Sequence, residues 1–254
     1  MVTGASQGIG RCIAISLANH GARLALVARN EAQLGETERL IRAEGGIAYS
    51  IPADVSNVAG IDPIKQRIQE HFGAPSILIN AAGVVGPLQT VQDSDPEQWV
   101  ATLMINMVAP YWMCRAFLPG MISSGWGRVV NVSSAASLGA PGSMNSAYVV
   151  SKVALNRFTR HLAAELAGTG VTANLIHPGE VKTHMWEDIR DGLEKKGPEA
   201  DGYREWVRWV EQTGGDPPQK AAELVLQLTT DQAAVTNGQF LWIENGLQAP
   251  LPSW

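Results

Sequence analysis

The stretch Thr3-Gly4-Ala5-Ser6-Gln7-Gly8-Ile9-Gly10 is the most informative part of this chain for its fold. Its three glycines separate an apolar start from an apolar helical segment. Gly4 permits a sharp turn, Gly8 lets the backbone come close to a pyrophosphate, and Gly10 lets a helix pack tightly on a strand. A helix that begins here also presents unpaired N–H groups to an anion. The spacing is GxxxGxG rather than GxGxxG, so the loop alone leaves an ordinary strand–helix turn as an alternative.

The remainder of the chain alternates short apolar runs with segments of helical periodicity. Strands that are apolar throughout are typical of a parallel sheet covered by helices on both faces. We therefore expect an α/β fold, a Rossmann-like doubly wound parallel sheet of about seven strands. Beyond the first, the expected strands are residues 23–28, 47–51, 76–80, 128–132, 171–176 and 239–243, and the expected helices are residues 9–20, 31–44, 61–71, 96–124, 147–167 and 218–230.

The start of the chain departs from this alternation. Only Met1 and Val2 precede the glycine loop. A strand of about five residues is usual at that place. We therefore expect part of the first strand to lie outside this sequence.

Residues 180–216 also depart from it, because they are charged, rich in tryptophan and interrupted by glycine and proline, with no apolar run that reads as a strand. A long excursion of this kind is often a functional loop, and we expect a substrate lid there. Helical i, i+3, i+4, i+7 spacing relates Tyr203, Trp206, Val207 and Val210. This stripe is either the wall of a hydrophobic substrate pocket or a face that packs on the rest of the chain.

The composition limits the classes of function. With 254 residues, of which 45% are hydrophobic, residues 1–254 are expected to form a single domain. The net charge of −5 and the scattered basic residues disfavour nucleic acid as a partner. The two cysteines, Cys12 and Cys114, make no disulfide framework. The longest apolar stretch is too short to span a membrane. We therefore expect a cytoplasmic protein. The histidines lack ligand spacing, and we expect no metal.

The end of the second expected strand bears on the choice of cofactor. An NAD-binding fold usually places an acidic residue there, which accepts hydrogen bonds from the adenosine ribose. Here Ala28 removes that carboxylate, and Arg29, followed by Asn30, offers a planar cation to a 2′-phosphate. We therefore favour NADP(H) over NAD(H); the alternative is that Arg29 is a solvated surface residue. Just past the third strand, Asp54 and Val55 are placed to frame an adenine.

A second group of residues carries chemistry. In an expected helix, Tyr148 and Lys152 are four residues apart, so they lie on one face and the ammonium comes close to the phenol. An unperturbed tyrosine has a pKa of about 10, and a nearby cation favours the phenolate that a base requires. Ser134, at the end of an expected strand, can hydrogen-bond the oxygen of a substrate. If this YxxxK pattern stood alone, two side chains that merely face solvent would be the better interpretation.

These motifs together resemble the short-chain dehydrogenase/reductase family, in its compact branch of about 250 residues, over nearly the whole chain. Residues 3–10 resemble its TGxxxGxG cofactor loop, residues 80–83 its NNAG element, Asn106 in MINMVAP its helix asparagine, and residues 177–183 (HPGEVKT) its PGxVxT segment. Ala81 replaces the second asparagine of NNAG. The separation of 14 residues between Ser134 and Tyr148 is one more than is usual in the family, and counting from Ser133 would fit worse.

The resemblance implies a catalytic tetrad. Tyr148 donates or accepts the substrate proton, Ser134 polarises the carbonyl oxygen, and Lys152 binds the nicotinamide ribose and lowers the pKa of the tyrosine. Asn106 holds a water in a proton relay. The expected cofactor contacts are Gly4, Ser6, Gln7, Gly8, Ile9, Gly10, Arg29, Asn30, Asp54, Val55, Asn80, Ala81, Gly83, Tyr148, Lys152, Pro178, Gly179, Val181 and Thr183.

The function that follows is an NADP(H)-dependent carbonyl reductase or alcohol dehydrogenase that interconverts a ketone and a secondary alcohol. The alternatives are a 3-oxoacyl thioester reductase and a cofactor-binding regulator without turnover, since a fold alone does not establish function. The small-molecule substrate is expected to be hydrophobic. The resemblance also implies a homotetramer, and we expect the apolar tail, residues 247–254, to dock on its own subunit or across an interface.

Overall fold

The computed structural model describes residues 1–139, 142–194 and 196–246, and within them the strands form one parallel sheet of seven. Its order is β3-β2-β1-β4-β5-β6-β7. The expected doubly wound α/β fold is confirmed, and the strand limits agree with the expected ones to within about a residue. The strands are β1 (Val2–Thr3), β2 (Arg23–Ala28), β3 (Ile47–Pro52), β4 (Ile77–Asn80), β5 (Gly127–Val132), β6 (Val171–His177) and β7 (Phe240–Trp242).

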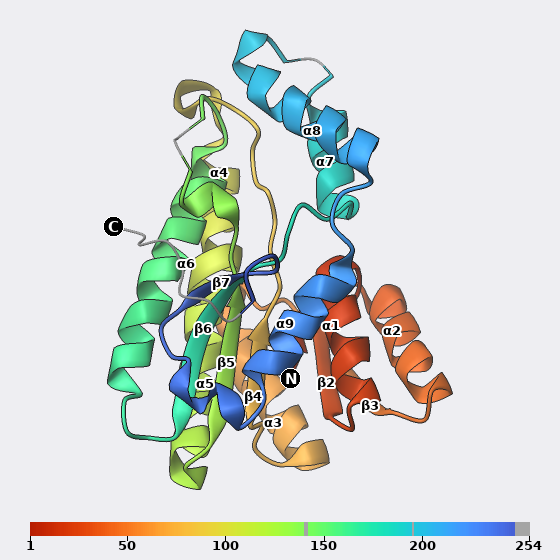
Figure 1. The fold of residues 1–254 in the computed structure, drawn as a ribbon, viewed down its shortest axis with the longest axis vertical. Coiled ribbons are helices and arrows are strands. Elements are labelled where there is room, and N and C mark those ends of the chain that lie inside the picture. Colours follow the sequence, from red (N-terminus) through yellow and green to blue (C-terminus); the bar gives the residue numbers. More distant parts are fainter. Residues whose placement is uncertain (140–141, 195, 247–254) are drawn as a thin grey trace.

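Helices cover both faces of the sheet (Figure 1). One face packs against α1 (Gly8–Asn19), α2 (Glu31–Ala43) and α9 (Pro218–Leu228), and the other packs against α3 (Ile61–Phe72), α5 (Ala109–Ser124) and α6 (Ser146–Glu165). An apolar core lies on each face of the sheet, and adjacent residues of one strand point into different cores. Leu26 faces α1, whereas Val27 faces the opposite side. Burial of both faces explains why the strands read as continuous apolar runs.

The short first strand lies at the centre of the sheet. Val2 pairs with Leu26 of β2 and with Ile79 of β4. The Met1 amino group donates a hydrogen bond to the Ile77 carbonyl at 2.9 Å. The order of the strands reverses between β1 and β4, and in such sheets ligands bind outside the carboxyl ends of the strands at that point.

The expected helix at residues 96–124 is helical throughout, but it is not a uniform α-helix. Residues 96–124 form α4 (Pro96–Leu103), a π-helical turn, η3 (Met104–Val108), and α5. A π turn holds one more residue than an α turn, so its residues depart from the helical register that periodicity alone would give. Asn106 lies inside this turn.

The excursion at 180–216 contains two helices, α7 (His184–Gly192) and α8 (Asp201–Thr213), and its described residues include no strand. Both helices project beyond the carboxyl end of the sheet (Figure 1). They have an apolar core of their own, which includes Trp186, Val207 and Val210. In the ranges that the structure describes, no helix is both long and apolar enough to cross a bilayer. The tail, residues 247–254, lies outside the described residues.

Candidate functional site

Two cavities adjoin at the carboxyl ends of the strands. The first, here the nucleotide cavity, has a volume of about 600 Å³, and the second, the catalytic cavity, about 540 Å³. The expected cofactor contacts that line the nucleotide cavity are Gly4, Ser6, Gln7, Gly8, Ile9, Gly10, Arg29, Asn30, Asp54, Val55, Ala81, Gly83 and Thr183. Those that line the catalytic cavity include Tyr148, Lys152, Pro178, Gly179 and Val181. Ile9, Ala81, Gly83 and Thr183 line both cavities, so the two are neighbours.

The glycine loop forms a cradle that side chains would fill. Gly4 has a φ of 67°, and a Cβ on it would lie 2.7 Å from the Ala82 nitrogen. A Cβ on Gly10 would lie 2.3 Å from the Gly4 carbonyl oxygen. The Thr3 hydroxyl accepts hydrogen bonds from the Ala81 and Ala82 N–H groups at 3.1 and 3.2 Å, which ties the end of β4 to the loop. This close backbone packing, with the N-terminus of α1 beside it, fits the pyrophosphate of a dinucleotide.

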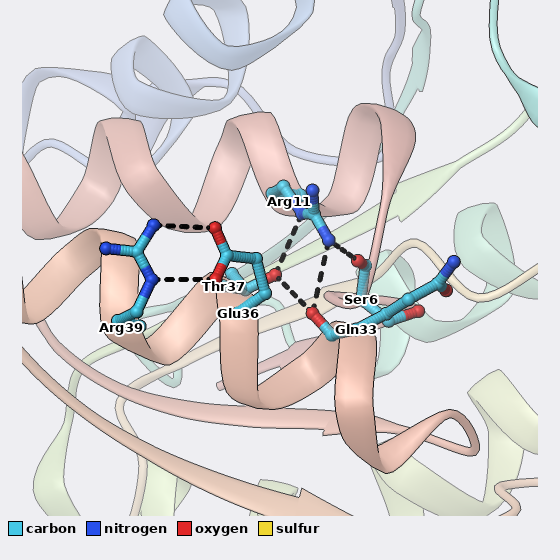
Figure 2. Close-up of polar contacts among 6 residues, drawn as sticks. All are labelled: Ser6, Arg11, Gln33, Glu36, Thr37 and Arg39. Carbon is cyan, nitrogen blue, oxygen red and sulfur yellow. Dashed lines mark hydrogen bonds and ion pairs between the residues drawn. The ribbon is translucent and has the colours of Figure 1, made fainter.

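Arg11, which was not predicted from the sequence, supports the glycine loop from behind (Figure 2). Its guanidinium donates to the Ser6 carbonyl, to the Gln33 carbonyl at 3.1 Å and to the Thr37 hydroxyl at 2.9 Å. The Thr37 hydroxyl in turn donates to the Ala5 carbonyl at 2.9 Å. Arg11 therefore joins α1, the loop and α2. A basic residue directly after the third glycine was the only signal in the sequence.

The far end of the nucleotide cavity is polar. Arg29 is exposed at the end of β2, and Asn30 caps α2 by accepting a hydrogen bond from the Gln33 N–H at 3.0 Å. Asp54 accepts hydrogen bonds from the N–H and hydroxyl of Ser56 at 2.8 and 2.7 Å. Burial opposes ionisation of Asp54, but the Ser56 hydrogen bonds and the charge of Arg29 outweigh it and lower its pKa. An exposed cation thus stands beside a carboxylate here.

Tyr148 and Ser134 meet in the catalytic cavity. Tyr148 is in the first turn of α6, and its hydroxyl lies close enough to the hydroxyl of Ser134, which follows β5, for hydrogen bonding to affect its pKa. Burial raises the pKa of Tyr148 to about 12, although the Ser134 hydrogen bond acts in the opposite direction. The charge of Glu180 adds to the rise. Ser133 points elsewhere, because its hydroxyl donates to Asn156 Oδ1 at 2.5 Å.

Lys152 lies one turn along α6 from Tyr148. Its ammonium donates a hydrogen bond to the Val132 carbonyl at 2.9 Å and lies 5.6 Å from the centre of the Tyr148 ring. Burial lowers the pKa of Lys152 to about 8. The expected lowering of the Tyr148 pKa by this cation is not seen in the structure, where burial of the phenol raises that pKa.

Asn106 and Asn80 are buried and line neither cavity. The Asn106 amide donates to the Val84 carbonyl and to the Ser151 hydroxyl at 2.9 and 3.0 Å and accepts from the Val84 N–H at 2.9 Å. Asn106 thus holds the segment after β4 against α6. Asn80 donates to Asn131 Oδ1 at 2.8 Å, which joins β4 to β5. The structure places both asparagines behind the walls of the cavities.

The excursion forms one wall of the catalytic cavity, and its apolar stripe divides between the two expected roles. Tyr203 and Trp206 line the cavity, whereas Val207 and Val210 belong to the apolar core of α7 and α8. One half of the stripe therefore faces the cavity and the other half packs against α7, and a hydrophobic substrate for this cavity stays a prediction.

Two hydrogen bonds join α8 to the rest of the site, and the sequence analysis missed them. The Tyr203 hydroxyl accepts from Asn145 Nδ2 at 3.0 Å, and the Trp206 indole donates to Glu180 Oε2 at 2.7 Å. Asn145 caps the N-terminus of α6 with a φ of 67°. Partners so far apart in the chain leave no local signal in the sequence.

Comparison with known proteins agrees with this geometry. The short chain dehydrogenase family model matches residues 1–194. The chain is 30% identical to a 3beta-hydroxysteroid dehydrogenase of Mediterraneibacter gnavus, over 97% of this chain and 93% of that protein. It is 34% identical to a D-beta-hydroxybutyrate dehydrogenase of Cupriavidus necator, over 97% and 95% of the two chains.

Solved structures show the same fold with nicotinamide cofactors. A variant of actinorhodin polyketide ketoreductase with NADPH matches with a TM-score of 0.86 and 28% identity, over 97% of this chain and 95% of that chain. NAD+-bound xylitol dehydrogenase matches with a TM-score of 0.86 and 26% identity, over 95% of each chain. The chain belongs to the short-chain dehydrogenase family, as an NAD(P)-dependent oxidoreductase that acts on hydroxyl or keto groups.

Proposed function

We propose that this protein is an NADP(H)-dependent oxidoreductase that interconverts a ketone and a secondary alcohol, with Tyr148 as general acid and base. The observation that carries the proposal is the meeting of Ser134, Tyr148 and Lys152 in a cavity that adjoins the glycine-loop cavity. A proton-transferring group must reach the reacting oxygen while the cofactor reaches the carbon, and adjoining cavities suit that arrangement.

When bound, a nicotinamide cofactor supplies or accepts the hydride. The side chains of this protein manage the proton. In reduction, the Tyr148 hydroxyl donates its proton to the carbonyl oxygen of the substrate, and in oxidation the phenolate takes it back. Ser134, which lines the cavity beside Tyr148, orients that oxygen. The Lys152 ammonium, held by the Val132 carbonyl, favours the phenolate electrostatically, and Asn106 positions the loop behind the site.

Arg29 supports the choice of NADP(H). It lines the nucleotide cavity, is exposed, and follows Ala28 where an NAD-binding fold usually carries an acid. Replacing Arg29 with Asp removes the cation and introduces a ribose acceptor, so the ratio of kcat/KM for NADPH to that for NADH is expected to fall at least about tenfold, equivalent to ~1.4 kcal/mol. Arg23→Asp, at the opposite end of β2, is the control. An unchanged ratio in Arg29→Asp would contradict the assignment.

We extend the proposal to the organisation of the protein. Residues 1–254 act as one dinucleotide-binding and catalytic domain, with 180–216 as a lid over a hydrophobic small-molecule substrate. The apolar and aromatic wall, including Met144, Met185 and Trp206, supports that substrate class. The two free thiols, Cys12 and Cys114, support a cytoplasmic location, and the assembly is a homotetramer.

The test is turnover by Tyr148→Phe. Oxidation of NADPH would be followed by absorbance with aliphatic, aromatic and cyclic ketones, and the affinity for NADPH measured by calorimetry. The variant is expected to lose turnover by about 10²–10⁴-fold, the usual contribution of a general acid, while it still binds NADPH. Tyr111→Phe, which removes the same hydroxyl from an exposed position on α5, is expected to keep full activity. An active Tyr148→Phe enzyme would overturn the mechanism.

A further inference from the structure

Glu180 places a carboxylate in the wall of the catalytic cavity, about a third exposed, and no lysine or arginine ion pair is recorded for it among the described residues. Its Oε2 accepts the Trp206 indole hydrogen bond at 2.7 Å. Its Oε1 lies 3.6 Å from His177 Nε2, which is longer than a hydrogen bond. One carboxylate oxygen therefore remains available to a molecule in the cavity.

His177 does not neutralise this carboxylate. Its Nδ1 accepts a hydrogen bond from the Ala135 N–H at 3.2 Å, so the ring proton of the neutral imidazole is on Nε2. Burial lowers the pKa of His177 to about 4, which leaves the ring uncharged near neutrality. The imidazole thus faces Glu180 as a neutral dipole.

The surrounding charges add to the negative potential. The Glu180 N–H donates to Asp216 Oδ2 at 3.0 Å, and Asp216 and Glu244 both act on the Glu180 carboxyl as like charges. Lys152 lines the same cavity, and its ammonium donates to the Val132 carbonyl. The Lys182 ammonium lies 4.9 Å from the Trp186 ring, and Lys220 pairs with Asp216 at 3.5 Å. A second carboxylate placed beside Glu180 would be repelled by it.

Asn145 offers a second acceptor in the same wall. Its side chain is 1% exposed, its Nδ2 is used by Tyr203, and its Oδ1 has no hydrogen-bond partner in the described part of the chain. A buried acceptor without a partner is costly, so it favours a ligand that brings a donor. Glu180 and Asn145 therefore share one requirement, which is a donor rather than an acceptor on the molecule bound.

We propose that Glu180 is a specificity-determining residue: it selects substrates that carry a hydrogen-bond donor, a hydroxyl or an ammonium group, beside an apolar body, and it rejects substrates that carry a carboxylate. The inference rests on the proposed ketone–alcohol chemistry of the same cavity. The aromatic rings of Tyr203 and Trp206 pack against the apolar body, while the free oxygen of Glu180 accepts the donor.

The experiment uses four acetophenones that differ only at the ring position opposite the acetyl group: methyl, hydroxymethyl, aminomethyl and carboxylate. Their affinities for the NADP+-saturated protein are measured by calorimetry, and their kcat/KM values with NADPH by absorbance. The hydroxymethyl and aminomethyl ketones are expected to bind at least tenfold more tightly than the methyl ketone, and the carboxylate at least tenfold more weakly. A larger gain in affinity for the aminomethyl ketone than for the hydroxymethyl ketone would show that the site selects ammonium groups. Equal gains in affinity would show that it selects hydrogen-bond donors in general.

Glu180→Gln keeps an acceptor for the Trp206 indole but removes the charge. It is therefore expected to reduce, at least tenfold, both the gain in affinity of the aminomethyl ketone and the loss in affinity of the carboxylate, each relative to the methyl ketone. Glu205→Gln is the matched control, because it removes the same charge from an exposed position on α8 that lines neither cavity. It is expected to leave the order unchanged.

The two proposals fail in different ways. The expected order of binding without turnover of any ketone would contradict the ketone–alcohol function and leave the selectivity of Glu180 standing. Three results would overturn the role of Glu180. The first is turnover with equal affinities for the four ketones, and the second is an order of affinities that Glu180→Gln does not change. The third is that none of the four ketones binds.

Discussion

Gly10 shows how single residues shape the nucleotide cavity. A Cβ at this position would meet the Gly4 carbonyl oxygen at 2.3 Å, which is backbone that cannot move without reshaping the loop. We expect Gly10→Ala to destabilise the protein by about 1–3 kcal/mol, the usual cost of overpacking, and to weaken NADPH binding. Urea unfolding and calorimetry would measure both.

Gly35 provides the control for that substitution. It lies inside α2, and a Cβ there would meet nothing within 4 Å. Gly35→Ala is therefore expected to stabilise the protein by about 0.4–1 kcal/mol, because alanine restricts the unfolded chain and favours a helix. Equal stability of the two variants would contradict the explanation that glycine is required at position 10 because α1 approaches the loop closely.

The titration of Tyr148 depends on Glu180 as well as on burial. The negative charge of Glu180 contributes to the raised pKa of Tyr148, which is about 12. In the proposed mechanism, oxidation of an alcohol needs the Tyr148 phenolate, so the rate of oxidation is expected to rise with pH as Tyr148 loses its proton. Glu180→Gln removes the charge, and the rising limb of kcat/KM for oxidation should move to lower pH. Glu205→Gln should leave the pH profile of kcat/KM for oxidation unchanged. A shift of the rising part of this profile to higher pH in Glu180→Gln would contradict the electrostatic coupling.

The residues that the sequence predicted well are those whose chemistry depends on near neighbours. Tyr148 and Lys152 share a face of α6 because four residues separate them, and the glycines act within one loop. Glu180, Asn145 and Arg11 were missed because their partners come from distant segments: Glu180 and Trp206 are 26 residues apart, and Asn145 and Tyr203 are 58 apart. No periodicity within one element reports such contacts.

At the scale of elements, regular helices and buried strands were predicted to within one or two residues, whereas irregular ones were not. The π turn at Met104–Val108 was missed because it continues the apolar pattern of the helices on both sides while changing the register. The two helices of the excursion were only partly foreseen. Their apolar residues form a separate small core, so the stripe on α8 was visible and its packing partner α7 was not.

The start of α6 has a strained cap that can be tested. Asn145 adopts a φ of 67°, a left-handed conformation that costs a residue with a Cβ about 1–2 kcal/mol, although asparagine tolerates it better than most. Asn145→Ala and Asn145→Gly both remove the hydrogen bond to Tyr203. We expect Asn145→Ala to be less stable to urea than Asn145→Gly by about 1–2 kcal/mol, since only glycine adopts this backbone without strain. Equal stability would mean that the backbone relaxes when the amide is removed.

At the scale of the whole molecule, several exposed apolar side chains lie on α4, α5 and α6, while others lie elsewhere on the surface. Val100, Tyr111 and Val150 are 54%, 43% and 44% exposed, and they lie on α4, α5 and α6, respectively. Helices α5 and α6 cover the same side of the sheet, and α4 packs against α6 (Figure 1). An apolar surface over consecutive packed helices suits the interface of the proposed homotetramer, in which each contact pairs a surface with its own copy.

That symmetry makes the interface sensitive to one charge. Because an isologous contact brings the same residue from both subunits to one patch, Val150→Glu would bury two like charges where two valines met. We expect the wild type to have four times the 27.2 kDa mass of the chain by light scattering, and Val150→Glu to dissociate into smaller species. Val235→Glu makes the same change at a side chain that is 92% exposed, outside α4, α5 and α6, and should remain assembled. A monomeric wild type, or equal dissociation of both variants, would show that this surface does not join the subunits.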